Sequence, residues 1–481
     1  MSAAPSATQS PPPEPGARRE LRENYGLWIG GEWSAPNGEA SYETIDPATE
    51  RSLTRVARAD AADVDRAVRA ARRAYEKYWR KLRPAERAKY LYRVARAIGE
   101  RAHDFARIET RDSGRLLRVT EADVAQTAAG FFYHAGWADK LAWAVESPER
   151  TRPFGVTGGI AAANSPLLSA ASKIAPALAC GNTVVVKPSE TAPLSALLLA
   201  EACAEADLPP GVVNIVTGDA RTGAALAEHP GVDRLAFTGG AEAGRAVRRA
   251  HAGRRLPPLL ELDGKAALIL YDDAALDQAV EAAVVALSGS ARSVRSAGWR
   301  VLVQESVAPE VLERLQARVA GLVHGDPADD RSDVGPVGSR ARLDALLALI
   351  ESASEDGAGV FAAQTALPEA GYWFRATLVT GIGTASRLLQ EAAFGPLAAI
   401  QTFRTPDEAV ELANAGPAGS ATAVWTGSGS LALNTAGRLR AGVVWCNAIE
   451  RSDASAPEGG FGGTGLGRSG GISGLRAYLE T

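Results

Sequence analysis

The middle of the chain alternates short runs of Val, Ile, Gly and Thr with longer Ala- and Leu-rich segments, and this alternation restricts the fold more than any other feature. The short runs are typical of buried strands, and the longer segments carry apolar residues at helical spacing. Because strands joined by covering helices run parallel, the pattern predicts an α/β fold with a parallel sheet covered on both faces. The expected strands span 158–162, 183–187, 212–217 and 234–238, and the expected helices span 167–179, 192–206, 223–228 and 240–252.

A second alternating block follows the first, from residue 266 to about 444. Its expected strands are 267–270 and 300–304, and its expected helices are 277–288 and 309–320. Upstream, the run LWIGGEW predicts a short hairpin that turns at the Gly-Gly pair, and residues 63–108 show helical periodicity. The first 24 residues are expected to be a disordered tail, because they begin with a Pro-, Ser- and Ala-rich stretch without periodicity.

Charge and composition exclude several classes of protein. The formal net charge is −4, without the basic stripe that nucleic-acid binders usually carry. The longest apolar stretch is interrupted by Lys173, Pro176 and Gly181, and the N-terminus lacks a secretory pattern, so we expect no membrane span and a cytoplasmic location. The 3 cysteines are too few and too scattered for a disulfide framework or a zinc site, so no metal is expected.

The first candidate site follows the strand 183–187. Lys187 directly before a proline places an ammonium at the carboxyl edge of the parallel sheet, where α/β folds bind ligands. Glu190, three residues on, is suited to accept hydrogen bonds from a ribose diol. A solvated lysine and glutamate that flank a loop would explain the same residues.

Two further motifs lie downstream. The glycines of Phe237-Thr-Gly-Gly-Ala-Glu-Ala-Gly244, between a strand and a helix, would let the backbone approach a pyrophosphate at the helix N-terminus, although such a run is usually only a turn. Glu261, after the apolar run Pro-Pro-Leu-Leu, is a candidate general base if it is buried. The alternative is a partly exposed glutamate that faces Lys265.

In order and spacing, these pieces resemble the NAD(P)-dependent aldehyde dehydrogenases. The resemblance runs from about Tyr25 to Glu480 and includes Asp46-Pro-Ala-Thr, the Asn164 segment and Lys187-Pro-Ser-Glu. It continues through Phe-Thr-Gly and Glu-Leu-x-Gly-Lys to three later motifs, which are Glu391-x-x-Phe-Gly-Pro, Gly442-Val-Val-Trp-Cys-Asn and Thr464-Gly-x-Gly-Arg. The resemblance implies a Rossmann-type nucleotide-binding domain, an α/β catalytic-type domain and a bridging element.

The resemblance also implies roles for individual residues. Asn164 would supply the oxyanion-hole amide, and Glu261 would be the general base. Lys187 and Glu190 would hold the adenosine ribose, and a glutamate there suits the free 2′-hydroxyl of NAD. The cofactor-binding set that the resemblance implies is Lys187, Glu190, Thr238, Gly239, Gly240 and Gly244, with Gly239 and Gly244 beneath the pyrophosphate.

One departure from the family decides the functional interpretation. In a gap-free alignment from Glu261-Leu-Asp-Gly-Lys265 onward, the family's nucleophilic cysteine falls at Arg295, and the loop 288–296 contains no cysteine. A guanidinium stays protonated and has no nucleophilic lone pair, so it cannot form the thiohemiacetal that the reaction needs. The 3 cysteines, which are Cys180, Cys203 and Cys446, are interpreted as small buried hydrophobic residues.

Other departures fall around the nicotinamide half of the implied site. The family's Pro-Trp before the asparagine is Ala162-Ala163, the glycine after Glu-Leu is Asp263, and the pyrophosphate serine is Gly240. The glutamate on the nicotinamide ribose is Ala392, and the aromatic residue of Pro-Phe-Gly-Gly is Glu458. NAD binding is therefore expected to be weak, or to use the adenosine half alone.

Arg295 itself has two expected arrangements. It could pair with Glu261 in a partly buried tunnel, since leaving either charge unpaired there would cost several kcal/mol. Such a pair would fill the space that an aldehyde needs and keep Glu261 ionised. Alternatively, the loop turns outward and Arg295 is solvated.

The expected domains are 25–136 with 153–262 for nucleotide binding, 263–458 for the catalytic-type domain, and 137–152 with 459–481 for a reduced bridging element. The favoured function is a catalytically inactive structural or regulatory subunit, similar to the non-catalytic half of family-16 aldehyde dehydrogenases. Its expected partner is a cysteine-bearing paralogue, or further copies of the chain in a homo-oligomer. The alternatives are an active NAD(P)-dependent oxidoreductase acting on aldehydes and a nucleotide-binding regulatory module.

Overall fold

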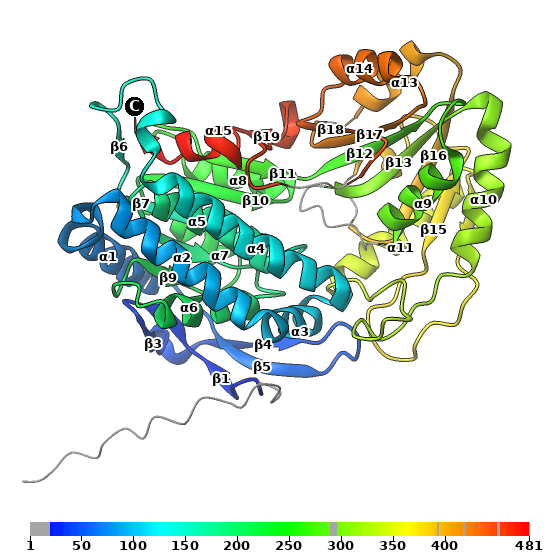
Figure 1. The fold of residues 1–481 in the computed structure, drawn as a ribbon. Helices are drawn as coiled ribbons and strands as arrows, with labels where there is room; N and C mark the ends of the chain where they lie inside the picture. Colours follow the sequence, from blue (N-terminus) through cyan, green and yellow to red (C-terminus); the bar gives the residue numbers. More distant parts are fainter. Residues whose placement is uncertain (1–19, 289–295, 392–393, 417–418, 450–452, 481) are drawn as a thin grey trace, which may run out of the picture.

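The computed structural model describes residues 20–288, 296–391, 394–416, 419–449 and 453–480. The described chain forms two halves, each built around its own sheet, and the short step from β11 to β12 carries the chain from one half to the other (Figure 1). The expected tail, residues 1–24, lies largely outside the described residues.

The first half holds an eight-stranded sheet in the order β19-β11-β10-β7-β8-β9-β2-β3. Its five central strands run parallel, as the alternation predicts, and antiparallel strands close both edges. The strands are β2 Leu27–Ile29, β3 Glu32–Ser34, β7 Val156–Ile160, β8 Thr183–Lys187, β9 Val213–Ile215, β10 Arg234–Gly239, β11 Leu259–Leu262 and β19 Gly465–Leu466.

Helices cover both faces of this sheet. α5 and α6 carry almost wholly buried side chains, because each packs between the sheet and the α2–α4 layer. The helices are α1 Ala61–Lys77, α2 Pro84–Glu100, α3 Ala102–Ser113, α4 Leu117–Ala138, α5 Pro166–Ala179, α6 Leu194–Glu205, α7 Ala220–Glu228 and α8 Ala241–Ala250. No described helix is long and apolar enough to span a bilayer.

Local chemistry explains several of these boundaries. The predicted hairpin is present as β2 and β3, and Gly30 and Gly31 take φ of 69° and 89° in its turn, a region that favours glycine. Asp60 caps α1, where its carboxylate accepts from the backbone N–H of Asp63 and the Asp63 side chain accepts in return. A small sheet in the order β1-β5-β4 lies beside this half, with β1 Asn24–Tyr25, β4 Ser41–Ile45 and β5 Ser52–Ala57.

The second half holds a seven-stranded sheet in the order β14-β15-β16-β13-β12-β17-β18. Its strands are β12 Gly264–Leu270, β13 Ser296–Gln304, β14 Gly359–Ala362, β15 Thr377–Thr380, β16 Leu397–Phe403, β17 Ala421–Trp425 and β18 Val443–Cys446. Its helices are α9 Leu276–Leu287, α10 Ala308–Ala320, α11 Arg340–Glu355, α12 Arg387–Gln390, α13 Pro406–Asn414 and α14 Gly429–Arg438. All pairs except β14–β15 are parallel, as the second alternating block predicts.

The C-terminal segment returns to the first half. Its strand β19 extends the eight-stranded sheet, and α15 Gly471–Arg476 packs on α5. The last described strand, β20 Leu479–Glu480, pairs with β6 Arg152–Pro153 in a two-stranded ribbon. The segments expected to form the bridging element therefore meet in this ribbon, while β19 belongs to the large sheet.

Candidate functional site

A cavity of about 540 Å³ lies at the carboxyl edge of the eight-stranded sheet. Its walls come from the ends of β7, β8 and β10, from α7 and α8, and from α11 and Phe394 of the second half. Every cofactor-binding residue expected from the sequence except Gly244 lines it, and Gly244 is buried on α8. The topology therefore brings the other expected cofactor-binding residues to one cavity, and the half-buried Asn164 lines the same cavity.

Lys187 is the last residue of β8 and is only 4% exposed, so the solvated alternative for this residue is wrong. Its Nζ donates to Glu190 Oε2 at 2.9 Å, and Glu190 is itself exposed at the cavity edge. A buried ammonium thus fixes a carboxylate at the cavity mouth. This arrangement is suited to accept the two hydroxyl groups of a ribose.

The N-terminus of α8 opens into the same cavity. Gly240 is the N-cap residue and supplies no side-chain cap for the first N–H groups of the helix, and Gly240 and Ala243 of this helix end line the cavity. Gly244 allows α8 to pack on β11, because a Cβ at this position would lie 2.3 Å from Leu262 Cδ2. A helix N-terminus in a cavity of this size is suited to an anion such as a phosphate.

Glu261, on β11, belongs to a buried polar network instead of facing Lys265. Thr238 Oγ1 donates to Glu261 Oε2 at 2.6 Å, and Lys173 Nζ donates to Thr238 Oγ1 at 2.6 Å. Lys173 Nζ also lies 3.7 Å from Glu261 Oε2 and donates to the Ser169 carbonyl at 3.1 Å. The carboxylate is 8% exposed, so the alternative of a partly exposed glutamate is also wrong.

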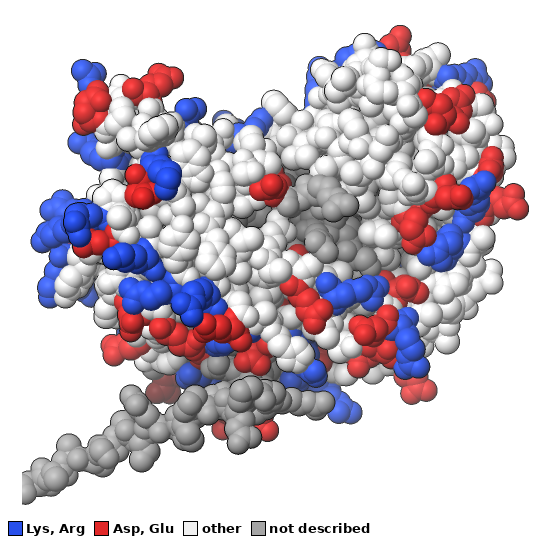
Figure 2. Space-filling model, viewed as in Figure 1, with Lys and Arg blue, Asp and Glu red and all other residues white. Residues whose placement is uncertain are grey.

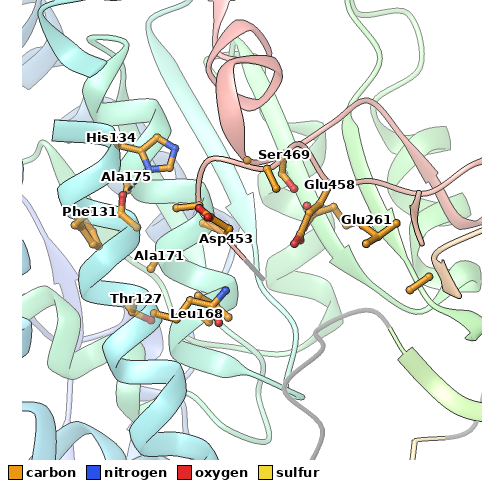
Figure 3. Close-up of a pocket in the computed structure, with 18 of the residues that line it drawn as sticks. Thr127, Phe131, His134, Leu168, Ala171, Ala175, Glu261, Asp453, Glu458 and Ser469 are labelled. Carbon is orange, nitrogen blue, oxygen red and sulfur yellow. Dashed lines mark hydrogen bonds between the residues drawn. The ribbon is translucent and has the colours of Figure 1, made fainter. Parts of the chain in front are cut away.

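A second cavity of about 120 Å³ reaches Glu261 from the other side of the sheet edge (Figure 3). One wall consists of α4 and α5 side chains, among them Phe131, His134 and Leu168, and the opposite wall carries Glu458 and Ser469 of the C-terminal segment. His134 is 6% exposed, and burial lowers its pKa to about 4, so it is neutral at pH 7. This wall carries no charged side chain at pH 7, and its polar groups besides His134 are those of Gln126, Thr127 and Ser172, while the opposite wall carries carboxylates.

The three cysteines do not lie in either cavity. Cys180 and Cys203 are buried, and burial raises the pKa of both thiols, to about 12 for Cys203. The expectation that Cys446 is buried is wrong: it is exposed, because it ends β18 at the edge of the seven-stranded sheet. None of the three is among the described residues that line these cavities.

Two residues of the sequence hypothesis, Arg295 and Ala392, lie outside the described residues, and so does the loop 289–295. The pairing of Arg295 with Glu261 therefore remains a prediction. Among the described residues, no group of three or more His, Cys, Asp or Glu side chains is arranged to hold a metal ion.

Sequence reasoning gave no role to three residues that the fold brings to the site: His134 and Arg342, which line the two cavities, and Lys173, which belongs to the buried network of Thr238 and Glu261. Lys173 carries a signal in the sequence, because it is a lone lysine in an otherwise apolar helix. His134 and Arg342 carry none, since nothing near them in the sequence differs from an ordinary amphipathic helix.

The two sheets and the cavity at the edge of the first define a nucleotide-binding dehydrogenase fold. The chain belongs to the aldehyde dehydrogenase family, because the model of the "Aldehyde dehydrogenase family" matches residues 33–481. The α/β architecture is that of the family, with a Rossmann-like sheet and a catalytic-type sheet.

Solved structures of similar proteins agree over nearly the whole chain. The NAD⁺ complex of an aldehyde dehydrogenase from Bacillus cereus is 33% identical with a TM-score of 0.92, and the match covers 98% of each chain. A betaine aldehyde dehydrogenase from Staphylococcus aureus, also with NAD⁺, is 32% identical with a TM-score of 0.90, covering 95% of this chain and 93% of that one. An NAD-dependent aldehyde dehydrogenase from Sinorhizobium meliloti is 30% identical with a TM-score of 0.91, covering 97% and 95%.

The residues of this chain fit NAD at one end of the cavity only. Lys187 and Glu190 fit a ribose, and the N-terminus of α8 fits a phosphate. At that N-terminus, however, the Asp263 carboxylate lies close to Gly240, with Oδ2 3.6 Å from the position of a Cβ there. A carboxylate in this place opposes the pyrophosphate of a dinucleotide.

Proposed function

We propose that this chain is a catalytically silent member of the aldehyde dehydrogenase family that acts as a structural or regulatory subunit. The single observation that carries the proposal is the absence of cysteine from residues 288–296, the segment in which the gap-free alignment with the family would put the nucleophile at Arg295. Without a thiolate, no thiohemiacetal forms on the protein, so there is no covalent adduct that could transfer a hydride to NAD.

The arrangement of Glu261 supports this proposal. A general base takes up a proton on a carboxylate oxygen, whereas Oε2 of Glu261 already accepts from Thr238 and lies beside the ammonium of Lys173, although a cavity reaches the residue. Both side chains are buried, so the pair contributes to the packing of α5 against β10 and β11. In this chain the glutamate serves the fold.

Surface features support a role in an assembly. Trp143 is 87% exposed, and Phe461, Leu466 and Ile472 of the C-terminal segment are 48%, 37% and 36% exposed. The face over α4 and α5 has few charged side chains, while Lys and Arg gather along α1 and α2 at its border (Figure 2). Exposed apolar side chains of this size favour a protein partner.

The partner that we propose is a cysteine-bearing paralogue, and its test is co-expression of the two chains. Co-purification in a fixed ratio, reduced by Trp143→Lys but not by the matched surface change Leu347→Lys on α11, would support the subunit role. Leu347 is 53% exposed and lies in the second half. A monomer that does not bind the paralogue would contradict the subunit role. A homo-oligomer would mean that further copies of this chain, and not a paralogue, bind to this face.

A second candidate function is a nucleotide-binding regulatory module, which the Lys187–Glu190 pair favours. Calorimetry with NAD tests it: we expect weak binding that Lys187→Ala abolishes. Tight NAD binding that Lys187→Ala leaves unchanged would contradict this assignment. The absence of any binding would leave the structural role alone.

A further inference from the structure

Asp263 is the residue between β11 and β12, and its carboxylate points into the larger cavity. Its backbone N–H donates to the Gly239 carbonyl at 3.2 Å, which fixes the residue beside the C-terminal end of β10. Its Oδ2 lies 3.6 Å from where a Cβ on Gly240 would be, so the carboxylate lies at the N-cap of α8. Among the described residues, none donates a hydrogen bond to this carboxylate.

A half-buried carboxylate without a hydrogen-bond donor is costly in its charged form. Burial accordingly raises the pKa of Asp263 to about 6, although the positive charge of Arg342 opposes the shift. Arg342 lines the same cavity, and its guanidinium lies over the Phe394 ring, 5.3 Å from the centroid. The carboxylate is therefore held near α8 by the backbone and not by a hydrogen bond to its own side chain among the described residues.

The N-terminus of α8 is the part of the cavity best suited to bind a phosphate, because its N–H groups and its dipole favour negative charge. A second anion brought to the same helix end would be repelled by the carboxylate. The repulsion disappears only if the carboxylate takes up a proton or moves away. The ligand phosphate and Asp263 thus compete for one position.

We propose that Asp263 is a specificity residue that holds a negative charge at the phosphate position of α8, so that the cavity accepts a nucleoside readily and its diphosphate derivative only when Asp263 is neutral. The proposal rests on the nucleotide cavity of the proposed function and deepens it, since it names the class of ligand that the cavity favours. Adenosine would bind through Lys187 and Glu190 without meeting Asp263.

Other charged groups surround Asp263. Those that line the cavity with it are Lys187, Glu190, Glu228 and Arg342, and Glu242 is exposed on the first turn of α8. Glu261 and Lys265 lie two residues away on β11 and β12. Lys265 also titrates near neutrality, because burial lowers its pKa to about 7. All of these groups remain in a variant at position 263, so a difference between the variant and the parent chain comes from Asp263.

Calorimetry with adenosine 5′-diphosphoribose tests the proposal on the full chain, because this probe has a diphosphate that stays fully charged at about pH 5.5 and about pH 7.5. If only neutral Asp263 admits the phosphates, a group titrating near pH 6 changes the affinity roughly 25-fold over this range. Adenosine is the matched ligand and should show no such change. Binding of the diphosphate near pH 7 should take up a proton, measured from the heats in two buffers.

The variants are Asp263→Asn and, as a control, Asp330→Asn, an equal change of charge at an exposed residue outside the cavity. We expect Asp263→Asn to bind the diphosphate at least about tenfold more tightly at pH 7.5 and without proton uptake, and Asp330→Asn to behave as the parent. Equal affinity and equal pH dependence in all three chains would overturn the role of Asp263 and leave the nucleotide cavity intact. If neither adenosine nor the diphosphate binds any chain, the role of Asp263 and the nucleotide-binding candidate function are both overturned, and the structural role is left alone. Proton uptake by the parent chain remains a test if Asp263→Asn does not fold.

Discussion

Replacement of Lys173 by methionine would test whether Glu261 serves the fold in this chain. The Lys173 ammonium is buried, and it donates to Thr238 and to the Ser169 carbonyl at 2.6 and 3.1 Å. Methionine keeps most of the volume and removes the charge that lies 3.7 Å from Glu261 Oε2. The change therefore leaves the Glu261 carboxylate buried without this partner.

The expected loss follows from the burial of the pair. Breaking a buried ion pair by removing one partner costs about 3–5 kcal/mol, and we expect the lower end because Glu261 also borders a cavity. Glu261→Gln should cost less, about 1–2 kcal/mol, since an amide still accepts from Thr238. In the double variant no charge is stranded, so its loss should be smaller than the sum of the two single losses by about 1–2 kcal/mol.

Urea unfolding followed by tryptophan fluorescence measures these losses, with the midpoint and slope of the first transition compared among the four chains. Ser172→Ala, one residue away on the same helix, is the control for a neutral change and should cost less than about 1 kcal/mol. A loss below about 0.5 kcal/mol for Lys173→Met, or strictly additive losses in the double variant, would refute a stabilising pair between Lys173 and Glu261.

Three other outcomes are expected. Burial lowers the pKa of His134 from 6.5 to about 4, so the contribution of this residue to stability is complete above pH 6.5 and is lost as the pH falls through 4. In unfolding measured from pH 7 to pH 4, His134→Gln should remove about 3 kcal/mol of the acid-induced loss of stability, and an unchanged pH profile would contradict this expectation. Glu109 has the opposite sign, because burial raises its pKa from 4.5 to about 7; its contribution is complete below pH 4.5 and is lost as the pH rises through 7, so Glu109→Gln should flatten the loss on the alkaline side of the same profile. Gly244→Ala should lower the melting temperature by an amount equivalent to about 1–3 kcal/mol, since its Cβ would lie 2.3 Å from a side-chain atom of Leu262. Gly253→Ala is the control: its Cβ would have no atom within 4 Å, and its φ of 81° should cost about 1 kcal/mol through backbone strain alone.

The regular elements of this chain are largely predictable from its sequence, for a physical reason. A strand buried on both faces needs a run of residues that pack on both sides, such as Thr183 and the three valines of β8 Thr183–Lys187. A turn such as Gly30-Gly31 needs residues that tolerate positive φ. Such requirements act on neighbouring residues and are visible in a window of the sequence. The sheet that they build also placed Lys187 and Glu190 together at its edge, as expected.

The buried network around Glu261 and the position of Asp263 at the N-terminus of α8 depend on residues that are distant in the sequence. Lys173 donates to Thr238 across 65 positions of the chain, and the positive charge of Arg342, on a helix of the other half, acts on the Asp263 carboxylate. No local pattern marks such a pair, because each residue alone fits an ordinary helix or loop. The prediction that Cys446 is buried is wrong for a related reason. A Val-Val-Trp-Cys run is typical of a buried strand, whereas this strand lies at the edge of the sheet.

The most direct test of catalytic silence is the formation of NADH by the purified chain with a panel of aliphatic and aromatic aldehydes at saturating NAD. We predict no NADH above background, because loss of the covalent nucleophile alone removes several orders of magnitude of rate. We also predict that Arg295→Cys recovers little, since Gly240 and Ala392 still stand where the resemblance implies the pyrophosphate serine and the nicotinamide-ribose glutamate, and Asp263 still carries a carboxylate at the N-cap of α8. The Glu261→Ala variant, purified in the same way, controls for a contaminating dehydrogenase, whose activity it would leave unchanged. Steady NADH formation by the parent chain that Glu261→Ala abolishes would show an active aldehyde dehydrogenase and contradict the account.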